Sequence, residues 1–284
     1  MTSAATVTLP TIAFLGGGSM ARAILAGLLA PGVSVEGGIR VTNRSVAKAA
    51  DFDGVPGVSA AATEIDPNAN RAAVAGARIV VVAVKPAMVP DLLTEIADAL
   101  EPGTLVISVA AGVTIATFEA LLPDAVAVIR SMPNTPAIVG KAVTGISAGT
   151  RSSAADLDLA TTLFETVGTA LVVPEGKLDA LSTISGSGPA YVFYLIEQFT
   201  RTAIDKGFTP DEAALLVEGT FLGSSLLLAS SDLGPAALRK QVTSPNGTTE
   251  RAIWELEKVD LKGLFDTATD AALARARELA APAV

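Results

Sequence analysis

The sequence predicts an α/β protein: an N-terminal, Rossmann-like doubly wound sheet followed by an all-helical C-terminal domain. Three observations predict it. Short β-branched runs alternate with helical runs in the first half, a glycine-rich turn joins the first strand to the first helix, and strand signals stop after residue 174. Such alternation is typical of βαβ units, which build a mostly parallel sheet with helices on both faces.

The N-terminal domain is expected over residues 1–173. Its strands are predicted where apolar, mostly β-branched residues cluster, at residues 11–15, 39–42, 79–84, 105–109, 126–129, 142–148 and 170–173. Helices are predicted between them at residues 19–29, 45–52, 60–65, 89–99, 115–121 and 154–167. Ser152 and Ser153 mark the start of the last of these helices, because serine is a favoured N-cap residue.

The C-terminal domain is expected over residues 174–284. Its helices are predicted at residues 177–184, 189–206, 210–230, 235–242, 249–258 and 261–280. Gly207 ends one helix, and Thr209 and Glu212 have the spacing of a capping box for the next. That helix, residues 210–230, is apolar nearly all round and must be surrounded, yet the domain is too small to cover it. We therefore expect a subunit interface built from this half of the chain.

Composition excludes several classes of function. The 284 residues are 50% apolar and carry a net charge of −9, which disfavours nucleic-acid binding and anionic membranes. Cysteine and histidine are both missing, so thiol chemistry is excluded and no metal site is expected. The first ten residues lack the basic segment of a signal peptide, and no stretch has the pattern of a membrane span. We expect a soluble, cytoplasmic protein.

A glycine-rich turn after the first strand predicts a dinucleotide site. The strand runs into Gly16-x-Gly18-x-x-Ala21, and a helix follows at once. Gly16 permits the tight turn, Gly18 lets the backbone approach a pyrophosphate, and Ala21 allows close packing of helix on strand. A plain glycine-rich turn is the alternative at this point.

The end of the second predicted strand indicates which dinucleotide is bound. NAD sites usually carry a carboxylate there, whereas this chain has Asn43, Arg44 and Ser45. Their donors and positive charge suit a 2′-phosphate. NADPH is therefore the expected cofactor, with NADH possible.

Two further loops are expected at the carboxyl edge of the sheet. Lys85 and Pro86 follow one strand, and we favour a backbone role beside the nicotinamide ribose over an acid role for Lys85. The loop after residue 129 holds Asn134 and Pro136 and is stiffened by two prolines, which suits either a binding-site wall or a structural loop. Residues 185–189, rich in glycine, indicate a helix break.

The segment at residues 242–249, VTSPNGTT, carries no charge. Pro245, Asn246 and Gly247 predict a turn, and Thr248 or Thr249 is expected to cap the next helix, with Glu250 in its first turn. Backbone amides at a helix N-terminus suit a carboxylate or phosphate. An ordinary capped loop is equally compatible with these residues.

Five segments together resemble pyrroline-5-carboxylate reductases in order and spacing: LGGGSMARAI (15–24), AVKP (83–86), IRSMPNTPA (129–137), SGSGPAYVF (185–193) and VTSPNGTT (242–249). The resemblance implies pyrophosphate contacts at Gly16, Gly18, Ser19 and Met20. It implies 2′-phosphate contacts at Asn43, Arg44 and Ser45. It places Lys85 and Pro86 beside the nicotinamide, in a pocket lined by Asn134, Pro136 and residues 185–189. It also implies substrate contacts at Ser244, Gly247, Thr248 and Thr249.

One residue departs from the family pattern. The family usually has two glycines after the proline of the substrate turn, and here Asn246 takes the first place. Asparagine is the non-glycine residue best suited to positive φ, so we expect the turn to survive and count Asn246 among the substrate-binding residues.

The resemblance implies reduction of the cyclic imine 1-pyrroline-5-carboxylate to L-proline, the last step of proline biosynthesis. The reaction needs a hydride from the cofactor and a proton on the imine nitrogen, which does not require histidine. We expect Thr249 to be catalytic, its hydroxyl bonding the ring nitrogen while the turn's amides hold the substrate carboxylate. Alternatives are a related reductase of another imine or a 3-hydroxy acid, and a non-enzymatic NADP-binding regulatory protein. The resemblance also implies a homodimer through the helical domain, often assembled into larger rings.

Overall fold

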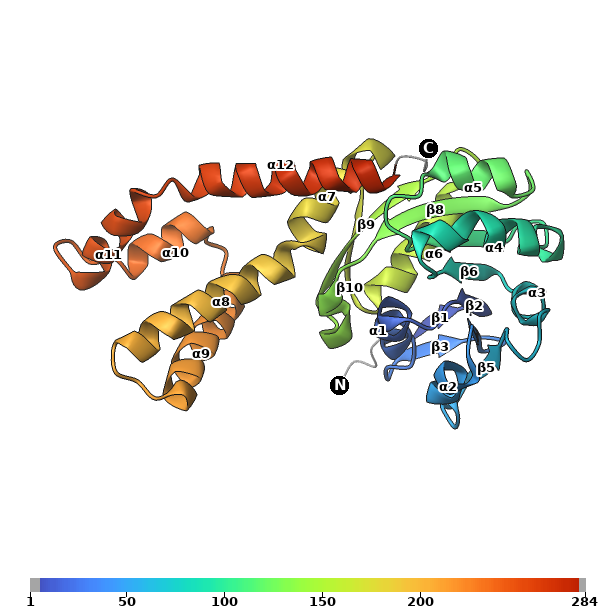
Figure 1. The fold of residues 1–284 in the computed structure, drawn as a ribbon, viewed down its shortest axis with the longest axis horizontal. Coiled ribbons are helices and arrows are strands. Elements are labelled where there is room, and N and C mark those ends of the chain that lie inside the picture. The colour runs from blue at the N-terminus through green and yellow to red at the C-terminus, as the bar shows by residue number, and fades with distance from the viewer. Residues whose placement is uncertain (1–5, 281–284) are drawn as a thin grey trace. The chain divides into compact units, whose positions relative to one another are not determined.

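The computed structural model describes residues 6–280, so the outer ends of the two predicted domains, residues 1–5 and 281–284, lie outside the described chain. Two compact units make up the described part (Figure 1). Gly188–Ala271 forms the helical unit, and the rest of the described chain forms the sheet unit.

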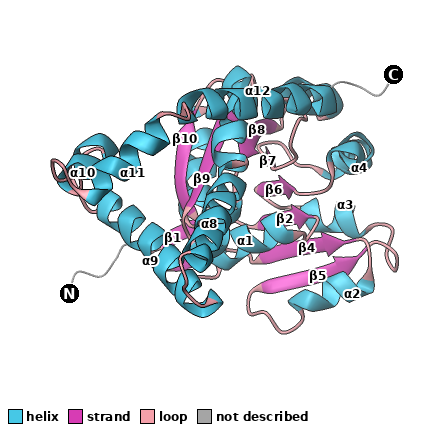
Figure 2. Ribbon diagram, turned by 60° about the vertical axis from the view of Figure 1, so that its left-hand side comes forward, coloured by secondary structure: helices cyan, strands magenta, loops and turns pink. Residues whose placement is uncertain are grey.

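An eight-stranded sheet lies at the centre of the sheet unit, in the strand order β10-β9-β8-β7-β6-β2-β4-β5 (Figure 2). Neighbouring strands pair in parallel, except that β8 and β9 are antiparallel. The strands are β2 (Ile12–Leu15), β4 (Ile39–Asn43), β5 (Val58–Ala62), β6 (Ile79–Val82), β7 (Leu105–Ser108), β8 (Ala127–Met132), β9 (Ala142–Ala148) and β10 (Gly168–Val172). A separate parallel pair is formed by β1 (Val7–Leu9) and β3 (Val33–Val35).

Helices cover both faces of this sheet, as the alternation predicts. They are α1 (Ser19–Leu28), α2 (Val46–Ala49), α3 (Ala69–Val74), α4 (Val89–Ile96), α5 (Ile115–Leu121), α6 (Ala154–Glu165) and α7 (Leu178–Leu181). Alternate strand residues point to opposite faces. Phe14 therefore packs with Ile24 of α1 and Phe164 of α6, whereas Leu15 packs with Leu93 of α4 and Phe118 of α5. The sheet unit has a complete core on both faces.

Short 3₁₀ segments extend several of these elements. They are η1 (Ala50–Phe52), η2 (Pro86–Met88), η3 (Ala97–Ala99), η4 (Thr135–Val139) and η5 (Glu175–Lys177). The capping box at the start of α6 is present, because Ser153 accepts from the Asp156 amide and Asp156 accepts from the Ser153 amide.

One predicted helix is wrong. Residues 60–65 were expected to be helical because of their alanines, but Val58–Ala62 is strand β5 and pairs in parallel with β4. Pairing along the whole length of β4 outweighs the helix propensity of three alanines. Strands β1 and β3 and helix α3 are elements that the sequence pattern did not predict.

Residues 185–189 do not break the helix. A π-helical segment, η6 (Ser182–Gly186), leads directly into α8 (Gly188–Asp205). The Ser187 amide bonds to the Ser182 carbonyl at 2.8 Å, the i→i+5 pattern of a π turn. Glycine here widens one helical turn instead of ending the helix.

Residues 174–187 group with the sheet in the structure. Arg130 of β8, 8% exposed in its side chain, pairs with Glu175 at 3.2 Å and with Asp179 of α7 at 2.6 Å. These ion pairs hold η5 and α7 against the sheet. The division of the chain into functional domains at residues 1–173 and 174–284 stays a prediction.

The helical unit consists of consecutive helices that pack in part on one another. They are α8, α9 (Pro210–Ala229), α10 (Pro235–Gln241), α11 (Thr248–Glu257) and most of α12 (Leu261–Ala280). The predicted capping box opens α9, where the hydroxyl of Thr209 accepts from the Glu212 amide. Gly207 ends the helical region before it with φ +100°, as predicted.

Candidate active site

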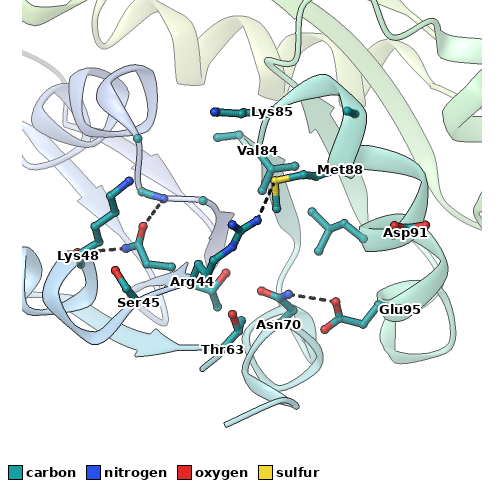
Figure 3. Close-up of a pocket in the computed structure, with 18 of the residues that line it drawn as sticks. Arg44, Ser45, Lys48, Thr63, Asn70, Val84, Lys85, Met88, Asp91 and Glu95 are labelled. Carbon is teal, nitrogen blue, oxygen red and sulfur yellow. Dashed lines mark hydrogen bonds between the residues drawn. The ribbon is translucent and has the colours of Figure 1, made fainter. Parts of the chain in front are cut away.

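A cavity of about 1110 Å³ opens at the carboxyl ends of β2, β4 and β6, inside the sheet unit (Figure 3). This is where ligands bind in doubly wound sheets. Seven of the predicted cofactor residues line it: Gly16, Gly18, Ser19, Asn43, Arg44, Ser45 and Lys85. The cavity also takes in residues that the sequence reasoning did not single out: Gly17, Arg22, Thr42, Lys48, Thr63, Pro67, Asn70, Ala83, Val84, Ala87, Met88, Asp91, Leu92 and Glu95.

The glycine loop forms one end of the cavity. Gly16 has φ +101°, and a Cβ on it would lie 2.7 Å from the carbonyl oxygen of Ala83. Gly18 is the N-cap of α1, and a Cβ on it would meet no atom within 4 Å. No side chain caps this helix, so its first amides are open to an anion. The loop fits a phosphate group.

Asn43 supports the glycine loop from beneath. Its Oδ1 accepts from the Gly17 amide at 3.0 Å, and its Nδ2 donates to the Lys48 carbonyl at 3.2 Å. The side chain is buried, and a Cβ on Gly17 would lie 2.7 Å from its Nδ2. The polar atoms of Asn43 are therefore engaged within the protein, and the residue fixes the shape of the loop.

Two cations border the cavity beside Ser45. Arg44 and Lys48 are exposed, and neither forms an ion pair within residues 6–280. The Arg44 guanidinium instead reaches the thioether of Met88 at 3.5 Å. Lys48 lies in α2, the short helix that directly follows the end of β4, and its place beside this strand end was the signal that could have revealed it.

Four of the predicted cofactor residues do not line the cavity. The Met20 side chain packs with the core formed by Ala23, Ala137, Ala142 and Val167. Pro86 begins η2, just after Lys85. Asn134 is buried, and Pro136 lies in η4.

Asn134 joins the π turn to the sheet. Its Nδ2 donates to the Ser185 carbonyl at 2.9 Å, and its Oδ1 accepts from the Val143 amide at 3.0 Å. Like that of Asn43, its side-chain amide is hydrogen-bonded to other parts of the chain. Its position fixes residues 182–186 on the sheet, which is a structural role beside any ligand contact.

The turn before α11 lies in the helical unit. Asn246 has φ 58°, so the predicted left-handed conformation is confirmed. The Gly247 amide donates to the Ser244 carbonyl at 2.9 Å and closes the turn. The N-cap of α11 is Gly247 and not, as predicted, Thr248 or Thr249, because the helix already begins at Thr248. Both threonines thus belong to the first helical turn, where amides lack intrahelical partners.

Glu250 also takes part in this turn, in the first turn of α11 as predicted. Its Oε2 accepts from the Asn246 amide at 2.9 Å. Of the four amides expected to hold the substrate carboxylate, those of Asn246 and Gly247 are therefore engaged within the chain. The amides of Thr248 and Thr249 find no hydrogen-bond acceptor among the described residues.

Comparison with known proteins gives the family of the chain. A curated pyrroline-5-carboxylate reductase from Pseudomonas aeruginosa is 38% identical over 272 residues, covering 95% of this chain and 97% of that protein. One from Mycobacterium tuberculosis is 35% identical and covers 94% and 96%. The chain belongs to the pyrroline-5-carboxylate reductase family.

Family models and solved structures agree with this assignment to the reductase family. Residues 175–279 match the model described as pyrroline-5-carboxylate reductase dimerisation, and residues 11–112 match that described as NADP oxidoreductase coenzyme F420-dependent. A pyrroline-5-carboxylate reductase structure from Coxiella burnetii superposes with a TM-score of 0.87 at 39% identity, covering 94% of this chain and 97% of that one. The Plasmodium falciparum pyrroline carboxylate reductase, with NADP bound, shares the fold at 24% identity and a TM-score of 0.80, covering 95% and 98%.

The region that matches the dimerisation model exposes large apolar side chains in this reductase. On α8 they are Val192, Phe193, Tyr194, Leu195, Phe199 and Ile204, and on α9 they are Leu215, Leu216, Leu222, Leu226, Leu227 and Leu228. Helix α9 is long and apolar enough to cross a membrane by length and composition, yet only 11% of the tested stretch is buried. An oligomer interface accounts for the same surface.

Proposed function

We propose that this reductase converts 1-pyrroline-5-carboxylate to L-proline with NADPH, the last step of proline biosynthesis. The observation that carries the proposal is the similarity to curated pyrroline-5-carboxylate reductases over 95% of the chain. No feature of residues 6–280 favours another imine, a 3-hydroxy acid or a regulatory role. A 3-hydroxy-acid enzyme of this architecture would need a catalytic lysine in the helical half. Lys206 comes directly after the end of α8 and is exposed.

The cofactor is proposed to lie along the cavity of the sheet unit. The glycine loop and the first amides of α1 would hold its pyrophosphate, with Gly16, Gly18 and Ser19 at the cavity wall and Met20 contributing its backbone. Arg44, Ser45 and Lys48 would hold the 2′-phosphate. Asn43 would contribute to the cofactor site by fixing the shape of the glycine loop. The unpaired cations support NADPH over NADH.

The nicotinamide side is proposed to lie by Lys85 and Pro86, with Asn134, Pro136 and residues 185–189 lining its pocket. Lys85 lines the cavity, and Asn134 holds the π turn in place. When bound, NADPH supplies the hydride for the reduction. The residues of the chain then have to bind, orient and desolvate the imine.

The substrate is proposed to bind at the turn before α11. The amides of Thr248 and Thr249 are the best donors for its carboxylate, because those of Asn246 and Gly247 are engaged. Ser244, Asn246 and Gly247 would shape the seat. The Thr249 hydroxyl would bond the ring nitrogen and so orient the C=N carbon, and a hydroxyl or water would supply any proton the nitrogen lacks.

The assembly is proposed to be a homodimer through the helical domain, with a larger ring as a further possibility of the family. The apolar side chains exposed on α8 and α9 support the dimer. The protein is proposed to act in the cytoplasm, on a small-molecule substrate and without nucleic acid or membrane partners. Its net charge of −9 supports the last point.

A kinetic experiment tests the proposed reaction and the role of Thr249. The purified protein is incubated with NADPH and 1-pyrroline-5-carboxylate, and the loss of NADPH absorbance is followed. Thr249→Val keeps the shape of the side chain but loses the hydroxyl, so kcat/KM should fall at least about tenfold, the effect of one lost hydrogen bond to a charged group.

Two outcomes would contradict the proposal. Absence of NADPH consumption by the wild-type protein would overturn the reaction. Wild-type kinetics in Thr249→Val would overturn the assignment of Thr249 alone. Thr248→Val separates the roles of the two hydroxyls, because it removes the neighbouring hydroxyl and leaves the Thr249 hydroxyl and both backbone amides in place.

A further inference from the structure

A carboxylate stands beside the strand end that is proposed to select the cofactor, although β4 itself carries none. Glu64 comes two residues after the end of β5, which pairs in parallel with β4. The pairing continues past the strand ends, because the Thr63 amide donates to the Asn43 carbonyl at 2.9 Å and the Glu64 amide donates to the Arg44 carbonyl at 3.0 Å. The backbone of Glu64 is therefore fixed next to Arg44.

The side chain of Glu64 is held at the same place. Its Oε1 accepts from the Val46 amide at 2.6 Å, and Val46 directly follows Ser45, which lines the cavity. Thr63, the residue before Glu64, lines the cavity as well (Figure 3). The carboxylate thus lies at the rim of the cavity, one hydrogen bond and one peptide bond away from Ser45.

The second carboxylate oxygen of Glu64 is open to a ligand. Glu64 is exposed, and within residues 6–280 its Oε2 accepts no hydrogen bond and its carboxylate forms no ion pair. An ionised carboxylate can only accept hydrogen bonds. Its free oxygen therefore suits a ligand group that brings a hydroxyl or an N–H.

The ribose of a dinucleotide supplies such a hydroxyl. In doubly wound sheets a carboxylate near this strand end accepts from the ribose 2′-OH of NAD, whereas a nearby arginine accommodates the 2′-phosphate of NADP. In this chain Arg44 follows β4, and Glu64 follows β5, the neighbouring strand of the sheet. Both kinds of recognition are thus present beside one position of the cofactor.

We propose that Glu64 accepts a hydrogen bond from the ribose 2′-OH of NADH, so that the cavity binds NADH as well as NADPH. The same carboxylate weakens the binding of NADPH, because it repels the 2′-phosphate at close range. Glu64 is thus a specificity-determining residue that limits the preference for NADPH. This inference rests on the cofactor site of the proposed function and concerns which of the two cofactors that site retains.

Binding measurements on the full-length protein test the inference without turnover. NADH and NADPH are titrated separately with wild type and with Glu64→Gln, and their own fluorescence is followed. The Gln side chain keeps an oxygen for the Val46 amide but loses the charge. The Kd for NADH should rise at least about threefold, because a hydrogen bond to a charged group is lost, and the Kd for NADPH should fall. Together the ratio of the two Kd values should shift about tenfold toward NADPH.

The direction of the change for NADH separates a hydrogen bond from a general effect of charge. Both cofactors carry a negatively charged pyrophosphate, so removing a negative charge from the rim strengthens the binding of both if charge alone matters. Only the loss of the acceptor for the hydroxyl weakens the binding of NADH. An unchanged or lower Kd for NADH in Glu64→Gln would overturn the inference.

Asp66→Asn is the matched control. It removes a carboxylate charge two residues further along the chain, where Asp66 is exposed and accepts from the Asn68 amide at 2.9 Å. The ratio of the two Kd values should stay at the wild-type value in this variant. The same shift in the ratio for Glu64→Gln and Asp66→Asn would count against a direct contact at Glu64 and overturn the inference.

The wild-type protein separates this inference from the cofactor site itself. Binding of NADPH without any binding of NADH would overturn the inference and leave the cofactor site intact. Binding of neither dinucleotide would overturn the cofactor site proposed above, and with it this inference. A thermal melt of Glu64→Gln at the wild-type temperature would show that the changed ratio does not arise from a damaged fold.

Discussion

The sheet unit and the helical unit differ in how they bury apolar side chains. Every residue of strand β6 is fully buried, and both faces of the sheet carry a packed core. Among residues 188–271, only Ala213 and Val217 are buried hydrophobic residues, and Leu215 is 75% exposed. The sheet unit can therefore be stable by itself, whereas the helical unit lacks most of the burial that stabilises a domain. A partner subunit in the proposed dimer would supply the remaining burial.

The largest expected effect comes from placing charges on the exposed face of α9. Leu222→Asp with Leu226→Asp would put two carboxylates into the proposed interface, where burial of unpaired charge is strongly unfavourable. We expect the dimer to be lost, with a change of at least about a hundredfold in the dissociation constant. Light scattering coupled to size-exclusion chromatography measures it.

The control for this pair is Leu233→Asp, the same change at an exposed leucine in the loop after α9. It should leave the assembly as it is. A dimer that survives the double substitution would show that α9 does not form the interface.

A smaller effect is expected from Arg44→Ala, which acts on the sheet unit alone. Arg44 has no ion-pair partner among the described residues and borders the cavity at the strand end proposed to select the cofactor. Its loss should lower the NADPH-to-NADH ratio of kcat/KM about tenfold, because one charge-assisted contact to the 2′-phosphate disappears. Steady-state kinetics with each cofactor measures the ratio. An unchanged ratio would mean that the 2′-phosphate is not held here.

The smallest expected effect is on the stability of the sheet unit. Burial of the Asp156 carboxyl acts to raise its pKa, but hydrogen bonds from Ser153 and Arg78 outweigh it, so the pKa of Asp156 lies below its usual 3.8. A carboxyl whose pKa is lower in the folded than in the unfolded state stabilises the fold at any pH above its unfolded-state pKa. This stabilisation is lost as the pH falls through the pKa of the folded state. Asp156→Asn should therefore lower the free energy of unfolding by about 1 kcal/mol at pH 7.

Urea denaturation at several pH values checks this prediction. The difference between wild type and Asp156→Asn should shrink once the pH falls below the usual pKa of aspartate, and assembly should not change. A difference that is constant down to pH 3 would contradict the role of the charged carboxylate.

Much of the sheet unit could be predicted from the sequence. Buried parallel strands read as continuous apolar runs, and β9 begins and ends at the predicted residues. Strand β5 could not be predicted, because its alanines favour helix and only its pairing with β4 makes it a strand. Lys48 could have been found from its place in the helix that follows the end of β4, but Asn70 and Glu95 meet only through the packing of α3, a helix that the sequence did not reveal.

For the turn before α11, the sequence predicted the positive φ of Asn246 but not the N-cap residue or the hydrogen bonds. Asparagine at position 246 does hold positive φ, as its side chain allows. The bond from its amide to Glu250 was not foreseen, because it depends on which way one side chain turns after the helix has formed. That bond engages the Asn246 amide, and the Ser244 carbonyl engages the Gly247 amide, so Thr248 and Thr249 keep the free amides among the four expected donors.

The central claim is that the sheet unit binds the cofactor and the turn before α11 binds the substrate. Measuring the Kd for NADPH and the KM for 1-pyrroline-5-carboxylate in Arg44→Ala and Thr249→Val tests it most directly. Arg44→Ala should weaken NADPH binding about tenfold with an unchanged KM for the imine at saturating NADPH, and Thr249→Val should leave the Kd for NADPH unchanged while lowering kcat/KM for the imine. Weakened NADPH binding in Thr249→Val, with the fold intact, would contradict this division.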